Sequence, residues 1–120
     1  MSDPRARRPM PGADGARAPE LRIDPLTDRA GLKVAGEICL PTHPEWERAL
    51  SRLARETGDP VHLELSDVTF VDMAGATALA VTALGLGHDR RLVLDRPPPG
   101  LSRLLELFWP DLPAIEVAAV

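Results

Sequence analysis

Residues 61–83 read VHLELSDVTFVDMAGATALAVTA, and this stretch decides the fold. Its first six residues alternate apolar Val61, Leu63 and Leu65 with polar neighbours, which is typical of a strand with one buried face. The strand is expected to end near Ser66, with a short loop at 67–71. From Asp72 onward the alternation stops. Residues 73–86 are apolar almost all round and rich in alanine, which predicts a deeply packed helix.

Toward the N-terminus the pattern predicts another helix and a hairpin. Between Thr42 and Thr57, apolar residues at helical spacing form one stripe, and Thr42 with Glu45 matches the reciprocal capping box. Before this helix, residues 21–24 and 32–35 alternate apolar and polar side chains around a turn-forming stretch at 26–31. Two neighbouring antiparallel strands are therefore expected to precede the helix.

Toward the C-terminus the alternation returns twice, at 92–94 and at 115–117, and each case predicts a strand. Between them, Pro97–Pro99 offers the start of a third helix, whose core-facing stripe would be Leu101, Leu104, Leu105 and Phe108. The order β-β-α-β-α-β-α-β predicts a single α/β domain with a mixed five-stranded sheet. Because crossovers between parallel strands are right-handed, the helices are expected mainly on one face of that sheet.

Composition limits the classes of partner. Residues 1–18 are rich in Pro, Gly and Arg and are expected to form a flexible tail, with the folded domain at 19–120. The whole chain of 120 residues has a net charge of −4, and the four arginines and two aspartates of the tail leave an acidic body. An acidic body argues against nucleic acid, which requires clustered cations. The lone Cys39 and the absence of a long apolar run predict a cytoplasmic protein that does not insert into a membrane.

The sequence offers little for catalysis. The three histidines, His43, His62 and His88, are widely spaced and match no metal-ligand pattern, so neither a metal nor a cofactor is expected. No serine lies in a nucleophile elbow, and no glycine-rich loop is suited to hold a phosphate. The chain is therefore predicted to be a binding protein and not an enzyme.

The junction between the central strand and its helix is the candidate site. Asp72 directly precedes the helix and is expected to accept hydrogen bonds from the free backbone N–H groups of its first turn. Ala74, Gly75 and Ala76 make that turn bare of large side chains. From the residues alone, two interpretations are equally good: close approach of a partner, or close packing of the helix on the domain's own sheet.

The same run resembles the STAS domain of bacterial anti-sigma factor antagonists. The resemblance is carried by residues 65–75, LSDVTFVDMAG, and by the pair Gly36–Glu37 after the second strand, and it extends over roughly 20–120. It implies docking of the helix start onto an anti-sigma factor or a GHKL-type serine kinase. The partner-binding residues would then be Asp67, Thr69, Phe70, Asp72, Met73, Ala74, Gly75 and Thr77.

The chain departs from that family at one position. The resemblance implies phosphorylation of a serine or threonine just before the motif glycine, but here this residue is Ala74. Thr69 and Thr77 are the substitute acceptors within reach. Three hypotheses remain open: an antagonist that phosphorylation does not silence, a divergent relative with another protein partner, or a STAS-type sensor or scaffold that takes a small ligand or nucleotide. A homodimer is also compatible with the sequence.

Overall fold

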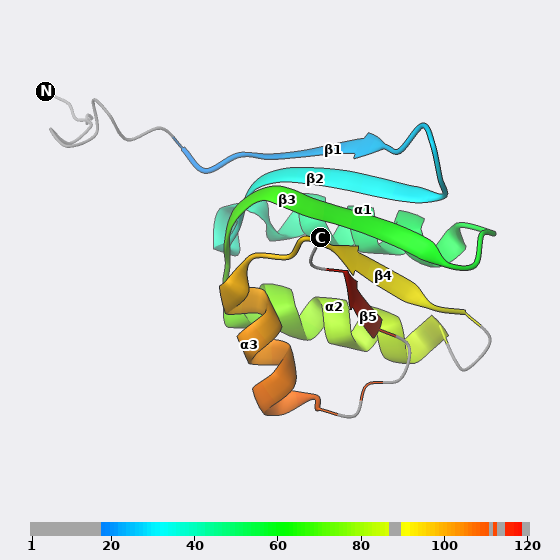
Figure 1. The fold of residues 1–120 in the computed structure, drawn as a ribbon. Coiled ribbons are helices and arrows are strands. Elements are labelled where there is room, and N and C mark those ends of the chain that lie inside the picture. Colours follow the sequence, from blue (N-terminus) through cyan, green and yellow to red (C-terminus); the bar gives the residue numbers. More distant parts are fainter. Residues whose placement is uncertain (1–17, 87–89, 111, 113–114, 119–120) are drawn as a thin grey trace, which may run out of the picture.

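The computed structural model describes residues 18–86, 90–110, 112 and 115–118 (Figure 1). All of the expected tail except Ala18 lies outside these residues. The elements are β1 (Leu21–Pro25), β2 (Gly31–Ile38), the short 3₁₀-helix η3 (Leu40–Thr42), α1 (His43–Arg55), β3 (Val61–Val71), α2 (Met73–Leu86), β4 (Leu92–Asp95), α3 (Pro99–Phe108) and β5 (Ile115–Ala118).

The five strands form one sheet in the order β1-β2-β3-β4-β5. β1 and β2 are antiparallel, and the remaining neighbours are parallel. Because each parallel pair is joined through a helix and the strands progress in one direction, right-handed crossovers place all three helices on the same face. Figure 1 shows α1 and α2 side by side behind the strands. The mixed α/β architecture expected from the sequence is confirmed.

The hydrophobic core lies between the sheet and the helices. The alternating apolar residues of β1 to β4 contribute to it, as expected, and are joined by the stripe of α1 and by Ala76, Leu79, Ala80 and Ala83 of α2. Ile115 of β5 also packs against the core, but Val117, expected on the same face, is 51% exposed. The largest fully buried side chains are Trp46, Leu32, Ile38, Leu53, Leu63, Leu65, Leu79, Leu92, Leu94, Leu101, Val34 and Val61. A single continuous core therefore holds the sheet and the helix layer together.

β3 is longer than expected. It does not end near Ser66, and the segment expected as a loop at 67–71 is part of the strand. Two register shifts in the pairing of β2 with β3 absorb the break in alternation, so that Ala35 pairs with Asp67 and Ile38 with Val71. The strand thus remains paired with β2 up to Val71, the residue before Asp72. α2 therefore begins directly after the C-terminal end of the central strand.

Gly36 lies where β2 is closest to the residue that precedes β1. It has a φ of +121°, a value that L-residues with a side chain rarely adopt. A Cβ added at this position would lie 2.1 Å from the carbonyl oxygen of Glu20. The glycine is therefore required by the backbone of the hairpin, and this explains Gly36 without a functional role.

Two expectations about helix ends are wrong. Thr42 precedes α1 but does not cap it, because its hydroxyl donates to the Glu37 carbonyl (2.7 Å) and accepts from the N–H of Cys39 (3.0 Å). Phe108 was expected in the core but is 55% exposed, whereas the neighbouring Trp109 packs against the core. Since α3 ends at Phe108 and the chain turns there, the indole and not the phenyl ring faces inward.

Candidate docking site at the start of the second helix

The start of α2 is held by a hydrogen bond to β2 and by the side chain of its own cap residue. The N–H of Asp72 donates to the Ile38 carbonyl of β2 at 3.0 Å, and an Asp72 carboxylate oxygen accepts from the N–H of Gly75 at 2.7 Å. That second bond is the N-cap expected from the sequence, and it satisfies one of the free donors of the first turn. The helix start is therefore fixed to the sheet before any partner arrives.

His43 adds a contact that the sequence did not indicate. Its Nε2 lies 3.0 Å from both carboxylate oxygens of Asp72. Because an ionised carboxylate only accepts, Nε2 carries the proton in this pair. His43 is the first residue of α1 and is separated from Asp72 by 29 positions, so only the fold brings them together. The pair connects the starts of α1 and α2.

Gly75 is buried, and its lack of a side chain serves packing inside the domain. A Cβ at this position would lie 2.5 Å from Cγ2 of Ile38, closer than carbon atoms can approach. Its carbonyl oxygen accepts a 3.0 Å hydrogen bond from Nε1 of the buried Trp46 of α1. Of the two interpretations of the bare first turn, close packing on the domain's own sheet is confirmed for Gly75, and a partner would not contact it directly.

Other members of the candidate set are on the surface. Phe70 is 52% exposed and Met73 is 43% exposed, and they flank Asp72 in the chain. Ala74 is also exposed. Leu40, which is 76% exposed, lies on η3 directly after β2, the strand whose end pairs with the end of β3. We call Leu40, Phe70, Met73 and Ala74 the docking surface. Leu40 was not among the expected site residues. The only feature of the sequence that could have indicated it is an apolar residue just after a predicted strand.

The two hydroxyls near this surface already have backbone partners. The Thr77 hydroxyl donates to the Met73 carbonyl at 2.9 Å, as helical threonines commonly do, and Thr77 is half-buried. Thr69 is exposed, and its hydroxyl donates to the Gly36 carbonyl at 3.4 Å. Both residues therefore have a structural use, and neither occupies the position of Ala74.

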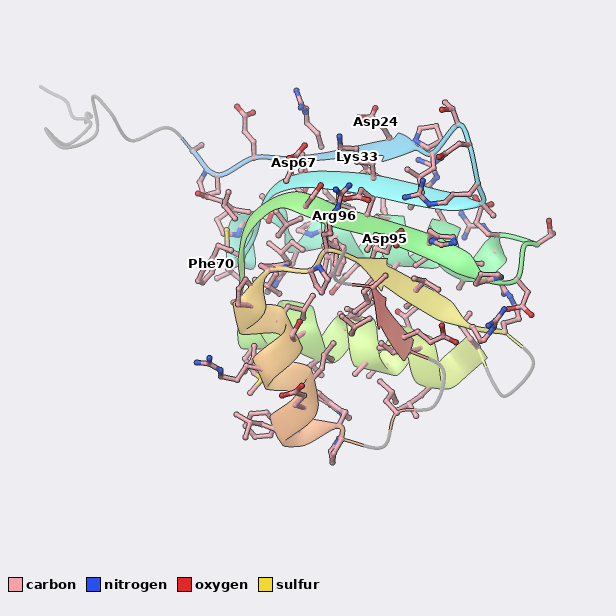
Figure 2. All side chains as sticks on the ribbon, in the orientation of Figure 1. Asp24, Lys33, Asp67, Phe70, Asp95 and Arg96 are labelled. Carbon is pink, nitrogen blue, oxygen red and sulfur yellow. The ribbon has the colours of Figure 1, made fainter. Side chains whose placement is uncertain are left out.

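Asp67 lies apart from the helix start. It lies four positions before Val71, about 13 Å away along β3. Its carboxylate pairs with Nζ of Lys33 at 3.3 Å on the uncovered face of the sheet. Figure 2 shows Asp67 near Lys33 and Phe70 at the far end of the strand. The structure therefore groups Phe70, Asp72, Met73 and Ala74, with Thr69 and Thr77 beside them, but not Asp67.

The uncovered face of the sheet carries a network of paired charges. The buried Glu64 accepts from the Ser66 N–H (3.1 Å) and from Arg96 (3.3 Å), and its other oxygen lies 3.3 Å from Arg29. Burial by itself raises the pKa of Glu64, but the Ser66 and Arg96 hydrogen bonds outweigh it and hold the pKa below its usual value. Arg29 also contacts Asp95 at 3.1 Å. These charges mainly satisfy one another, which is typical of a structural network.

Within the described ranges, no group of three potential metal ligands comes together. In the same part of the chain, no helix is both long enough and apolar enough to cross a membrane.

Comparison with known protein families identifies the same fold that the structure shows. The family model described as "Mlab, STAS domain" matches residues 21–109, which is well over half of the chain. No curated protein matches the chain. The match identifies a STAS-type regulatory domain, from a family that is generally non-catalytic. The matched region contains β1 to α3 and the capped start of α2. By this match and by its fold, the chain belongs to the STAS domain family.

Proposed function

We propose that this STAS domain binds a protein partner, an anti-sigma factor or a GHKL-type serine kinase, through the docking surface of Leu40, Phe70, Met73 and Ala74. The observation that carries the proposal is the exposure of two large apolar side chains, Phe70 and Met73, on either side of a rigidly capped helix start. Apolar side chains held on a fixed frame lose little conformational entropy on binding, so most of their contact free energy contributes to affinity.

Ala74 determines how such binding is controlled. A methyl side chain cannot accept a phosphate, so the surface keeps its apolar character in the presence of a kinase. Phosphorylation of Thr77 would break its bond to the Met73 carbonyl, and phosphorylation of Thr69 would break its bond to the Gly36 carbonyl. We propose that the domain acts as an antagonist whose binding is not ended by phosphorylation at the position before Gly75.

The test is affinity capture from extract of the native cells with the full chain as bait, followed by titration of the purified captured protein. Phe70→Ala is compared with Phe108→Ala, because the two phenylalanines are 52% and 55% exposed and lie on different elements. A central interface aromatic contributes about 2 kcal/mol, so Phe70→Ala is expected to weaken binding about 30-fold. Phe108→Ala is expected to leave it unchanged. Equal affinity of the Phe70→Ala variant and the wild type would refute the proposal.

A further inference from the structure

A second surface runs along α2, away from the docking surface. None of the fourteen residues of α2 is charged, although the helix borders solvent along its length. Val81 and Leu84 are 60% and 58% exposed, two to three turns beyond Met73. A helix on the surface of a domain ordinarily presents charged side chains to water. The outward face of α2 is therefore an uncovered apolar stripe of the kind that marks an interaction surface.

A hollow of about 450 Å³ separates this stripe from α1. From α2 it is lined by Ala78, Val81, Thr82 and Gly85, and from α1 by Glu47, Leu50, Ser51 and Ala54. Most of these side chains are small. A groove between two adjacent helices, with small residues on its walls, has the shape that receives a third helix.

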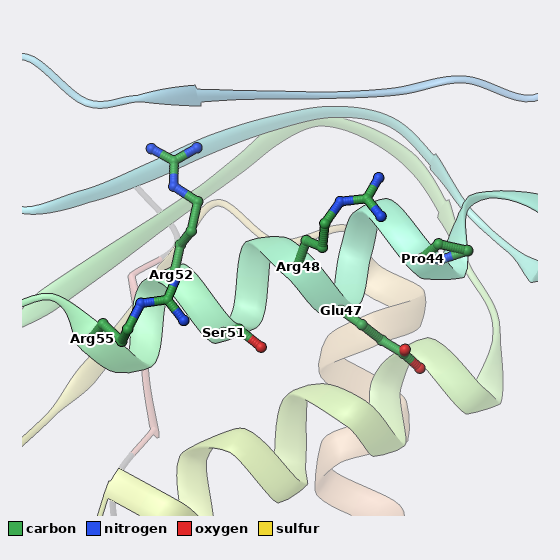
Figure 3. Close-up of a pocket in the computed structure, with 6 residues that line it drawn as sticks. All are labelled: Pro44, Glu47, Arg48, Ser51, Arg52 and Arg55. Atoms are coloured by element: carbon green, nitrogen blue, oxygen red, sulfur yellow. The ribbon is translucent and has the colours of Figure 1, made fainter.

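The far side of α1 is basic. Arg48, Arg52 and Arg55 follow one another at helical spacing, and with Ser51 and Glu47 they line a second hollow that shares these last two residues with the first. Figure 3 shows Arg48 and Arg52 extending from the side of α1 turned away from α2. All three arginines are exposed, and none forms an ion pair with another residue in the described ranges. The two hollows thus make one band, apolar on α2 and basic on α1.

We propose that this band binds an acidic amphipathic helix of a protein partner. The apolar side of that helix would contact Ala78 and Val81. Its acidic flank would lie over the small residues Ser51 and Ala54 of α1 and face the arginines beyond them. The α2 wall of the groove, from Ala78 to Gly85, is about 10 Å long, which corresponds to roughly two turns of an occupant. This surface is separate from the docking surface, and the inference does not depend on the identity of the partner proposed above.

Charge selects this occupant over two others. The chain as a whole has a net charge of −4, so an anionic bilayer would be repelled by most of the molecule, whereas a helix confined to the groove faces chiefly the arginines. A second copy of the chain is a poor fit, because α3, which exposes apolar Leu107 and Phe108, carries only one acid, Glu106, and also a base, Arg103. Glu47 is the one acid in the linings of the two hollows, and a basic or hydrogen-bonding group of the occupant would face it.

The test uses the full chain and a designed probe, a fluorescein-labelled 18-residue peptide with leucines at helical spacing and glutamates on both flanks. A matched peptide with lysines in place of glutamates is the charge control. Fluorescence polarisation measures affinity, and amide chemical shifts in NMR spectra locate the site. We expect the acidic peptide to bind at least tenfold more tightly than the basic one, with shifts concentrated on residues 47–55 and 78–85.

Two variants test the two halves of the band. Val81→Glu places a charge on the apolar side, and the double variant Arg52→Glu, Arg55→Glu reverses the basic side. Each is expected to lower the affinity for the acidic peptide at least tenfold. Leu107→Glu on α3, where Leu107 is 66% exposed, is the control and is expected to leave that affinity unchanged. Circular dichroism and thermal unfolding verify that every variant is folded, and Ser51→Trp, whose large uncharged side chain is expected to block the groove, provides a further variant if one of them unfolds.

Several outcomes would overturn the inference. These are no binding of the acidic peptide at millimolar concentration, equal binding of the basic peptide, or shifts that map to another face. Binding of the chain to vesicles containing an anionic lipid but not to the acidic peptide would identify a membrane surface instead. A dimer in light scattering that Val81→Glu dissociates would identify a second copy of the chain as the occupant.

Discussion

Replacing Gly75 with alanine tests whether the start of α2 is positioned by packing against β2. The new Cβ would lie 2.5 Å from Cγ2 of Ile38, 3.1 Å from an Asp72 carboxylate oxygen and 3.3 Å from Cγ1 of Val71. Ile38 is fully buried, so it has little room to move. Overpacking of this kind costs about 1–3 kcal/mol. Alanine regains about 0.5–1 kcal/mol of helix propensity, so the net loss of unfolding free energy is expected to be about 0–2.5 kcal/mol.

A double-mutant cycle identifies the cause of that loss. Ile38→Ala alone is expected to cost about 2–5 kcal/mol, because it leaves a cavity in the core. In the double variant the added methyl group of residue 75 no longer meets Cγ2 and instead occupies part of that cavity. The two changes should therefore be non-additive by about 1–3 kcal/mol, with the double variant more stable than the sum implies.

Urea unfolding followed by circular dichroism measures all four proteins of the cycle. Gly85→Ala is the matched control, because Gly85 lies in the same helix with nothing within 4 Å of an added Cβ. It is expected to stabilise the domain by about 0.5–1 kcal/mol. Strict additivity of the Ile38 and Gly75 changes, or stabilisation by Gly75→Ala equal to that of the control, would show that the close contact does not position the helix.

Three further predictions concern the cap, the buried acid and the missing hydroxyl. Asp72→Ala should lower the unfolding free energy by about 1 kcal/mol. Asp72→Asn should lower it by less, because the amide oxygen still accepts from the Gly75 N–H. Equal losses for the two variants in urea unfolding would contradict this prediction. Because the folded pKa of Glu64 is lowered, its carboxylate stabilises the domain above its ordinary pKa of 4.5, and this contribution is lost as the pH falls toward the folded value. Unfolding curves of Glu64→Gln and wild type should therefore converge at acid pH, and an offset independent of pH would refute the assignment. A captured serine kinase should phosphorylate the Ala74→Ser variant but not the wild type in mass spectrometry, and stoichiometric phosphate on Thr69 or Thr77 with loss of binding would restore a covalent switch.

The element order and the core could be predicted because they depend on local pattern. The bounds expected for α2 match the observed helix, since Asp72 and the alanine-rich run are signals within one segment. The length of β3 was missed for the opposite reason. Residues 67–71 alternate irregularly, and only the register shifts against β2 keep Val71 paired with Ile38. A single sequence contains no signal for a pairing that a distant strand imposes.

The candidate site was predictable in part for the same reason. Asp72 caps α2 through a bond to a residue three positions away, and this could be expected from sequence. The contact of His43 with Asp72 and the close packing of Gly75 against Ile38 depend on residues brought together by the fold. Gly75 illustrates the limit of prediction from sequence, because it was a candidate for partner contact and the structure places it in the interior. A bare helix turn looks the same in sequence whether it faces a partner or the domain's own sheet.

The geometry at the start of α2 also explains why a hydroxyl before Gly75 would make an effective switch and why Ala74 changes the outcome. A phosphate there would add a charge of about −1.5 to −2 two residues from Asp72, whose carboxylate already occupies the Gly75 N–H. The phosphate would therefore gain little from the helix start, while its hydration would separate Met73 and Phe70 from a partner. With alanine in that position the apolar surface is constant. Under the proposed function, binding is then controlled by the concentration of the partner and not by a covalent change at this turn.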